Sequence, residues 1–198
     1  IGENMKKERL KVKCLGLDEN GKGIVRIKGT EYYLSNLLEG ETGIVEISQN
    51  RRGTTIRLIK IEETSKDRVK AKCPYFDKCG GCQLQHMSYE RQSKFKQAKV
   101  EELMGSFCKV NPIMVMEEPY NYRNKIHSTF SYDRRRQIIS GMYMENTHDV
   151  VNINRCLIQD SKADEIIETI RGFMKSFKMR PFDEDTGEGF LRHVLIKR

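Results

Sequence analysis

Apolar and polar residues alternate in five short stretches near the start of the chain. These stretches cover residues 10–15, 24–27, 32–34, 43–47 and 55–61. Alternation with a period of two is typical of strands that bury one face. Turn-forming residues separate the stretches, as in residues 18–23 and 39–41. Five short strands at this spacing predict a small closed β-barrel of the OB type in residues 1–64.

The pattern changes to a helical one in the next region, residues 65–110. Ser88 is a suitable N-cap and Gly105 a suitable stop, so we expect a helix from Tyr89 to Met104. Its apolar residues fall roughly on one side of the helix: Phe95, Val100, Leu103 and Met104. Basic residues occupy the rest of this helix.

The pattern in residues 111–198 predicts an antiparallel sheet with helices on one face. Strands are expected at 125–132, 138–144, 148–153 and 190–197. Ser161 to Asp164 resembles a capping box and opens a helix that Pro181 stops. Its apolar residues predict a buried stripe: Ile166, Ile167, Ile170, Phe173, Met174 and Phe177. The fold class is therefore α+β, with two helices holding this last domain together.

Charge and composition narrow the class of protein. The net charge is +8, and its excess falls in the N-terminal half, as binding to a polyphosphate backbone would require. A solvated basic surface is the alternative. No apolar run approaches the ~20 residues of a membrane helix, and no secretory signal is visible. We expect a monomeric cytoplasmic protein that does not enter a membrane.

Three cysteines lie close together in the sequence: Cys73, Cys79 and Cys82. Gly80 and Gly81 let the backbone bend tightly between the last two sulfurs. A tetrahedral metal site or an iron–sulfur cluster needs four ligands, and Cys156 is the best candidate for the fourth. This spacing favours a [4Fe–4S] cluster first and a zinc ion second. The alternative is that these are buried, inert thiols.

The other two cysteines stand among aliphatic neighbours. Cys14 and Cys108 are therefore expected to pack in the core and not to act as ligands.

Four stretches together resemble the S-adenosylmethionine-dependent uracil-5-methyltransferases of RNA, especially the 23S rRNA type. The matching stretches are residues 21–24 with 38–41, the cysteine loop running into residues 84–86, residues 122–125, and residues 141–158 with 191–196. The resemblance implies an N-terminal TRAM domain, a [4Fe–4S] loop and a central RNA-recognition domain.

Members of that family continue into a domain that binds S-adenosylmethionine and carries the catalytic residues. No glycine-rich strand–turn–helix loop is visible before Arg198, so we expect no catalytic residue in this chain and no methyl transfer by it alone. In the complete enzyme, the resemblance implies that a cysteine thiolate attacks C6 of uracil and that C5 then takes the methyl group. The present segment would bind RNA around a flipped-out base.

Residues 122–125 contain the first candidate RNA contacts, Tyr122, Arg123 and Lys125. Arginine pairs with phosphate and stacks on unpaired bases, and tyrosine stacks as well. Arg192 and His193 are further candidates on the last strand. The alternative is that Tyr122 packs in the core and Arg123 forms a surface ion pair.

Two other functions are compatible with the sequence. One is a free-standing RNA-binding module with a zinc ion or a cluster and no catalysis. The other is an electron carrier, which the basic charge disfavours. For the RNA-binding interpretations the partner is structured rRNA or tRNA, and the family resemblance favours 23S rRNA.

Overall fold

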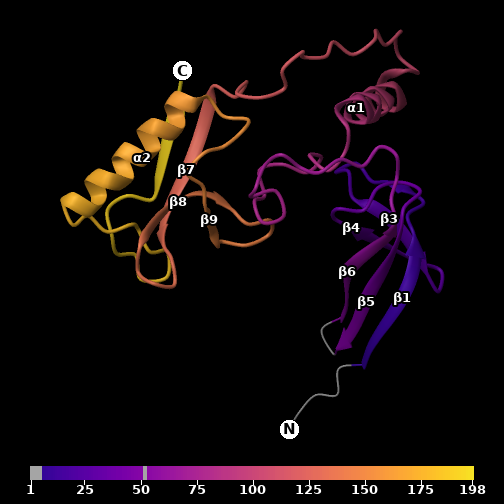
Figure 1. Cartoon of the computed structure of the whole chain (residues 1–198), viewed down its shortest axis with the longest axis horizontal. Coiled ribbons are helices and arrows are strands. Elements are labelled where there is room, and N and C mark those ends of the chain that lie inside the picture. Colours follow the sequence, from indigo (N-terminus) through magenta and orange to yellow (C-terminus); the bar gives the residue numbers. More distant parts are fainter. Residues whose placement is uncertain (1–5, 51–52) are drawn as a thin grey trace. The chain divides into compact units, whose positions relative to one another are not determined.

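The computed structural model describes residues 6–50 and 53–198 and has an α+β fold with mostly antiparallel sheets (Figure 1). The chain divides into two compact units. Unit 1 comprises residues 1–71 and Gln83–Met114, and unit 2 comprises Lys72–Cys82 and Val115–Arg198. Each unit is therefore built from two separate stretches of sequence.

Unit 1 contains two antiparallel sheets of three strands. The first has the order β1-β5-β6, from β1 (Lys6–Lys13), β5 (Thr42–Asn50) and β6 (Gly53–Glu63). The second has the order β2-β3-β4, from β2 (Gly16–Leu17), β3 (Gly23–Ile27) and β4 (Thr30–Leu34). The five predicted strands are present, and β2 is an additional short one.

Within the part of unit 1 that the structure describes, the ladders form two separate three-stranded sheets, and the expected closed five-stranded barrel is not shown. At residues 14–15 the chain passes from the first sheet to the second. The N–H of Cys14 donates to the carbonyl of Glu41, whereas the next N–H, that of Leu15, donates to Ile24 on β3. The two sheets still share one core, which contains Val12, Val25, Leu37 and Val45.

Helix α1 (Tyr89–Met104) has the predicted bounds, and the Ser88 side chain accepts a hydrogen bond from the N–H of Arg91. Its predicted apolar face is not buried, because no residue of α1 is buried in the structure. Val100, Leu103 and Met104 are all exposed. Most of the apolar side of α1 is therefore exposed.

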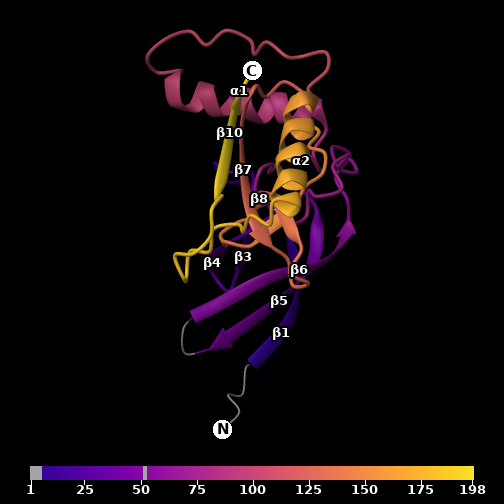
Figure 2. The ribbon, with the colours of Figure 1, turned by 90° about the vertical axis from the view of Figure 1, so that its left-hand side faces the viewer.

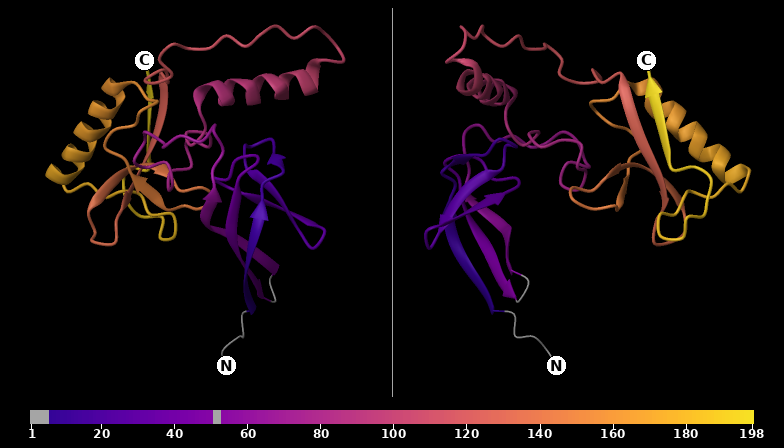
Figure 3. Two further views of the ribbon diagram at one scale, coloured as in Figure 1. Left: turned by 45° about the vertical axis from the view of Figure 1, so that its right-hand side comes forward. Right: turned by 180° about the vertical axis from the view of Figure 1, so that it is seen from behind.

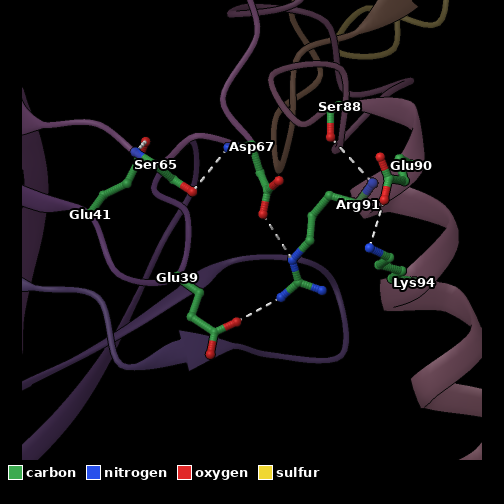
Figure 4. Close-up of polar contacts among 8 residues, drawn as sticks. All are labelled: Glu39, Glu41, Ser65, Asp67, Ser88, Glu90, Arg91 and Lys94. Atoms are coloured by element: carbon green, nitrogen blue, oxygen red, sulfur yellow. Dashed lines mark hydrogen bonds and ion pairs between the residues drawn. The ribbon is translucent and has the colours of Figure 1, made fainter.

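Polar contacts attach the start of α1 to the rest of unit 1 (Figure 4). The guanidinium of Arg91 lies 2.6 Å from a carboxylate oxygen of Glu39 and 3.7 Å from one of Asp67. The carbonyl of Asp67 accepts a 2.8 Å hydrogen bond from the N–H of Ser88. Nearby, Arg68 pairs with the fully buried carboxylate of Glu41.

Unit 2 is built on a four-stranded antiparallel sheet with the order β10-β7-β8-β9. Its strands are β7 (Lys125–Tyr132), β8 (Ile138–Tyr143), β9 (Val150–Asn152) and β10 (His193–Lys197). The predicted strand positions are correct, although β9 and β10 are shorter than expected.

Helix α2 (Ser161–Ser176) lies along one face of this sheet (Figure 2). Asp160, and not Ser161, is its N-cap, and its carboxylate accepts from the N–H of Lys162. The core between helix and sheet contains Ile126, Phe130, Ala163, Ile167 and Met174.

The predicted stripe on α2 is too wide. Ile167 and Met174 are buried and Ile170 packs against the core, but three members are exposed: Ile166, Phe173 and Phe177. A four-stranded sheet covers only the narrow face on which residues four and seven apart align. The prediction of two helices in this domain is also wrong, since α1 belongs to unit 1.

Candidate functional site

The loop of residues 72–82 brings three cysteines into unit 2, where Cys156 also lies. Cys73, Cys79, Cys82 and Cys156 are all half-buried and free of disulfide bonds. Two tight turns shape the loop, with the N–H of Phe76 donating to Cys73 and that of Cys79 donating to Tyr75. Phe76 is buried, so its ring anchors the loop in the unit.

The end of strand β8 holds this loop. The N–H of Gly80 donates to the carbonyl of Tyr143 at 3.0 Å, and Cys79 forms a β-bridge with Met144. A Cβ at Gly80 would lie 3.0 Å from that carbonyl oxygen and 3.2 Å from the backbone nitrogen of Glu145. Glycine therefore permits the close approach of loop and strand.

Cys156 lies between β9 and α2. Its N–H donates to the carboxylate of Asp164, in the first turn of α2, at 3.0 Å. Burial raises the pKa of the Cys156 thiol, the N–H groups of Ile158 and Gln159 lower it, and the charges of Asp164 and Cys82 raise it further. Cys82 therefore lies close enough to Cys156 to raise the pKa of the Cys156 thiol.

Similar influences act on the pKa of Cys79 in the loop. Burial raises the pKa of Cys79, the N–H of Gly81 acts against this from 3.4 Å, and Cys82 and Cys73 raise it. Among the described residues, no three side chains of His, Cys, Asp or Glu are arranged to hold a metal ion as they stand.

The two remaining cysteines differ from each other. Cys14 is buried and its thiol donates to the carbonyl of Gly16 at 3.2 Å, as expected for a core residue. Cys108 is exposed, so the expectation that it packs in the core is wrong.

Backbone hydrogen bonds hold the Tyr122–Lys125 segment beside the residues that follow Cys156. The N–H of Arg123 donates to Ile158, and the N–H of Asp160 donates back to the carbonyl of Arg123. Tyr122 is 51% exposed, which excludes the alternative that it is a core residue. The charge of Arg123 is among the influences that lower the pKa of Cys79, so this guanidinium lies near the cysteine loop.

Lys125 and His193 lie on the same face of the sheet. Lys125 pairs with Lys197 in the ladder between β7 and β10, and Thr129 pairs with His193 four residues along each strand. Because side chains alternate between the two faces of a sheet, this even separation places both pairs on the same face. Lys125 is exposed, and the Nδ1 of His193 lies 3.1 Å from the hydroxyl of Thr129. Strand pairing thus unites two groups of candidate RNA contacts that the sequence places far apart.

Arg192 is already engaged in an ion pair. Its guanidinium lies 2.5 Å from a carboxylate oxygen of Glu184 and 5.7 Å from the centre of the Phe182 ring. Sequence reasoning did not identify Glu184. It also missed His127, although the alternation of Lys125, His127 and Thr129 was a signal that could have placed His127 beside Lys125.

The chain is similar in sequence to proteins described as RNA methyltransferases. An uncharacterized RNA methyltransferase of Halalkalibacterium halodurans is 32% identical over 97% of this chain, which corresponds to 43% of the relative. Similar proteins of Clostridium tetani and Clostridium acetobutylicum are 34% and 35% identical over 92% and 90% of this chain. The chain spans about two fifths of the length of each of these relatives. No family model matches.

The fold is similar to that of a solved methyltransferase. The crystal structure of the Pyrococcus abyssi tRNA (uracil-54, C5)-methyltransferase with S-adenosyl-L-homocysteine superposes with a TM-score of 0.62 and 20% identity. The match covers 96% of this chain and 42% of that protein. Neither helix within residues 6–50 and 53–198 is long and apolar enough to cross a membrane.

Proposed function

We propose that this chain is the RNA-recognition and iron–sulfur portion of an S-adenosylmethionine-dependent RNA uracil-5-methyltransferase. The observation that carries the proposal is the similarity to relatives described as RNA methyltransferases over nearly the whole chain. The shared fold with a tRNA uracil-C5-methyltransferase supports the same reaction class. The favoured substrate is 23S rRNA, with tRNA as the alternative.

The chain's contribution in this proposal is to bind and orient RNA. The exposed Tyr122 would stack on a base and the exposed Lys125 would contact a phosphate. Arg123, between them in sequence, would add a positive charge near the cysteine loop. We assign no catalytic residue to this chain. The methyl donor would be bound by the remaining part of the complete enzyme, so this chain alone should transfer no methyl group to RNA.

Cys73, Cys79, Cys82 and Cys156 would hold the [4Fe–4S] cluster. The fit rests on four cysteine thiols that lie in one unit, with the N–H of Gly81 directed at the sulfur of Cys79. Backbone N–H groups stabilise the negative charge of ligating sulfurs. The cluster would supply a covalent tie between the loop and the region before α2, and we assign it no redox role.

The cluster is tested by anaerobic purification and metal analysis. We expect iron and sulfide in stoichiometric amounts with absorbance in the visible range. Cys156→Ser should lose most of both, whereas Cys108→Ser, at an exposed cysteine outside the group, should retain them. Stoichiometric zinc without visible absorbance would support a zinc-containing RNA-binding module in place of the cluster protein.

RNA binding is tested by fluorescence anisotropy with a structured rRNA fragment over a range of salt concentrations. Lys125→Ala should weaken binding and reduce the salt slope by about one, because one phosphate contact and its released counterion are lost. Lys162→Ala is the matched control, since Lys162 is exposed on α2 and pairs with Glu165. Equal effects of the two substitutions would count against the proposed phosphate contact.

A further inference from the structure

The sheet of unit 2 has one face that α2 does not cover. Ile126 and Phe130 of β7 and Ile196 of β10 belong to the core beneath α2. Because side chains alternate along a strand, the residues between them point to the opposite side. We call this side the open face. It carries Lys125, His127, Tyr143, His193, Leu195 and Lys197, together with Thr129 and Ile139, which are buried. Figure 3 shows the sheet and α2 from two further directions.

Four aromatic rings form a continuous row on or beside the open face. The rings of His127 and His193 have centroids 4.6 Å apart with a tilt of 41°. The ring of Tyr143 is edge-on to His193 at 6.4 Å and lies 5.7 Å from the ring of His148. Three of the four histidines in the chain are therefore gathered in this row. Three strands (β7, β8 and β10) and the loop after β8 supply the four rings, so the row exists only in the folded sheet.

Hydrogen bonds hold these rings in place. The Thr129 hydroxyl contacts His193 Nδ1, and the Tyr143 hydroxyl donates to Glu184 at 3.2 Å. Glu184 also lies 3.3 Å from Nδ1 of His148 and pairs with Arg192. Burial lowers the pKa of His193, and the neighbouring His127 and Arg192 lower it further, against the raising influence of Glu184. The lowered pKa favours the uncharged form of the ring, which offers a π-face.

Positive charge borders the row at its other end. Lys125 and Lys197 are directly paired in the ladder between β7 and β10, and both are exposed. Leu195, between them and His193, is 54% exposed. A row of rings beside two cations is complementary to a nucleic acid strand, in which each base offers a stacking face and each sugar is followed by a phosphate. A face for a protein partner would be more apolar at its centre.

We propose that the open face binds an unpaired segment of RNA, with bases stacked on His127, His193 and Tyr143 and phosphates at Lys125 and Lys197. The inference rests on the proposed function, because that function supplies RNA as the partner. It adds a binding surface formed by β7, β8 and β10, in addition to the Tyr122–Arg123 contacts. Bases extruded from a folded RNA are the parts that such a surface can reach.

The test uses the full chain and a uridine-rich single-stranded RNA that contains one 2-aminopurine. Stacking of the 2-aminopurine on the protein should quench its fluorescence, and anisotropy gives the affinity. His127→Ala should weaken binding about tenfold or more and abolish the quenching, since one stacked base contributes about that much. His127→Phe should keep both, because it preserves a ring. Tyr143→Ala is the second ring variant, and circular dichroism verifies that each variant is folded.

One control and one further variant make the outcome specific. Phe173→Ala removes an exposed ring from α2, away from the open face, and should leave binding unchanged. Lys197→Ala should reduce the salt slope by about one without loss of quenching. If wild-type RNA affinity survives His127→Ala and Tyr143→Ala with full quenching, the stacking surface is wrong while the proposed function stands. If the wild-type chain binds no RNA, both proposals fail.

Discussion

The guanidinium of Arg68 holds the buried carboxylate of Glu41 through two hydrogen bonds. Arg68 Nε lies 2.5 Å from Oε1 of Glu41 and Arg68 Nη2 lies 2.6 Å from Oε2. The same carboxylate accepts from the N–H groups of Leu38 and Ser65, and its side chain has no exposed surface. One ion pair therefore connects the β-sheets of unit 1 to the segment that leads toward the cysteine loop.

Removing the arginine should destabilise unit 1 strongly. Arg68→Ala leaves the Glu41 charge buried without its partner, which typically costs about 3–5 kcal/mol. Arg91→Ala is the matched control, because it breaks a more exposed pair with Glu39 and should cost about 0–1 kcal/mol. Urea denaturation of the two variants measures the difference. Similar losses in both would mean that burial of the Glu41–Arg68 pair is not what stabilises this region.

The Glu41–Arg68 pair also predicts that the stability of unit 1 depends on pH. Burial raises the pKa of Glu41, but hydrogen bonds from Arg68, Leu38 and Ser65 outweigh it, so the pKa in the folded state is lowered. The unfolded chain then binds this proton more readily. The stabilisation is present above the unfolded pKa of about 4.3 and is lost as pH falls through the folded value. Urea midpoints between pH 6 and pH 3 should fall less for Glu41→Gln than for the wild type.

Helix α2 allows a comparison between a buried and an exposed residue. Met174 is 1% exposed in the core of unit 2, so Met174→Ala should cost about 2–5 kcal/mol. Phe173, its neighbour in sequence, is 57% exposed, and Phe173→Ala should change stability by less than about 1 kcal/mol. Thermal unfolding of both variants gives the comparison. A larger loss from Phe173→Ala would show that the outer face of α2 is covered in solution.

Two glycines should respond to alanine with opposite signs. A Cβ at Gly141 would lie 2.0 Å from the carbonyl oxygen of Val151, so Gly141→Ala must push β8 and β9 apart and should cost about 1–3 kcal/mol or more. A Cβ at Gly172, inside α2, meets nothing within 4 Å. Gly172→Ala should therefore stabilise by about 0.5–1 kcal/mol. Denaturation midpoints that move in the same direction would contradict this reading of the sheet.

Local patterns in the sequence were sufficient for most of the elements. Ser88 and the residues after it set the bounds of α1, and the strand Lys125–Tyr132 was predicted to the residue. Burial was less predictable, because it depends on what lies opposite each face. The helical periodicity of Val100 and Leu103 in α1, or of Ile166 and Phe173 in α2, shows which side is apolar but not whether another element covers it.

The candidate sites divide in the same way. The cysteine loop is a local motif and was visible at once, whereas its neighbours depend on tertiary contacts. Nothing in the sequence placed Arg123 near Cys79 or fixed the register that sets His193 opposite Thr129. His127 and Tyr143 each look unremarkable in their own strands. Their relationship to His193 arises only once the order β10-β7-β8 is known.

The discontinuous make-up of the two units has a consequence for the order of events on the ribosome. The chain passes from unit 1 to unit 2 at residues 71–72, back at 82–83, and again to unit 2 at 114–115. The sheets of unit 1 are complete before the cysteine loop is synthesised, and domains generally fold as units from the N-terminus. The three loop thiols then emerge long before β8, β9 and Cys156, which are needed to enclose them. During that interval the three thiols lie between two stretches of unit 1 and lack the strands and the fourth cysteine that later surround them.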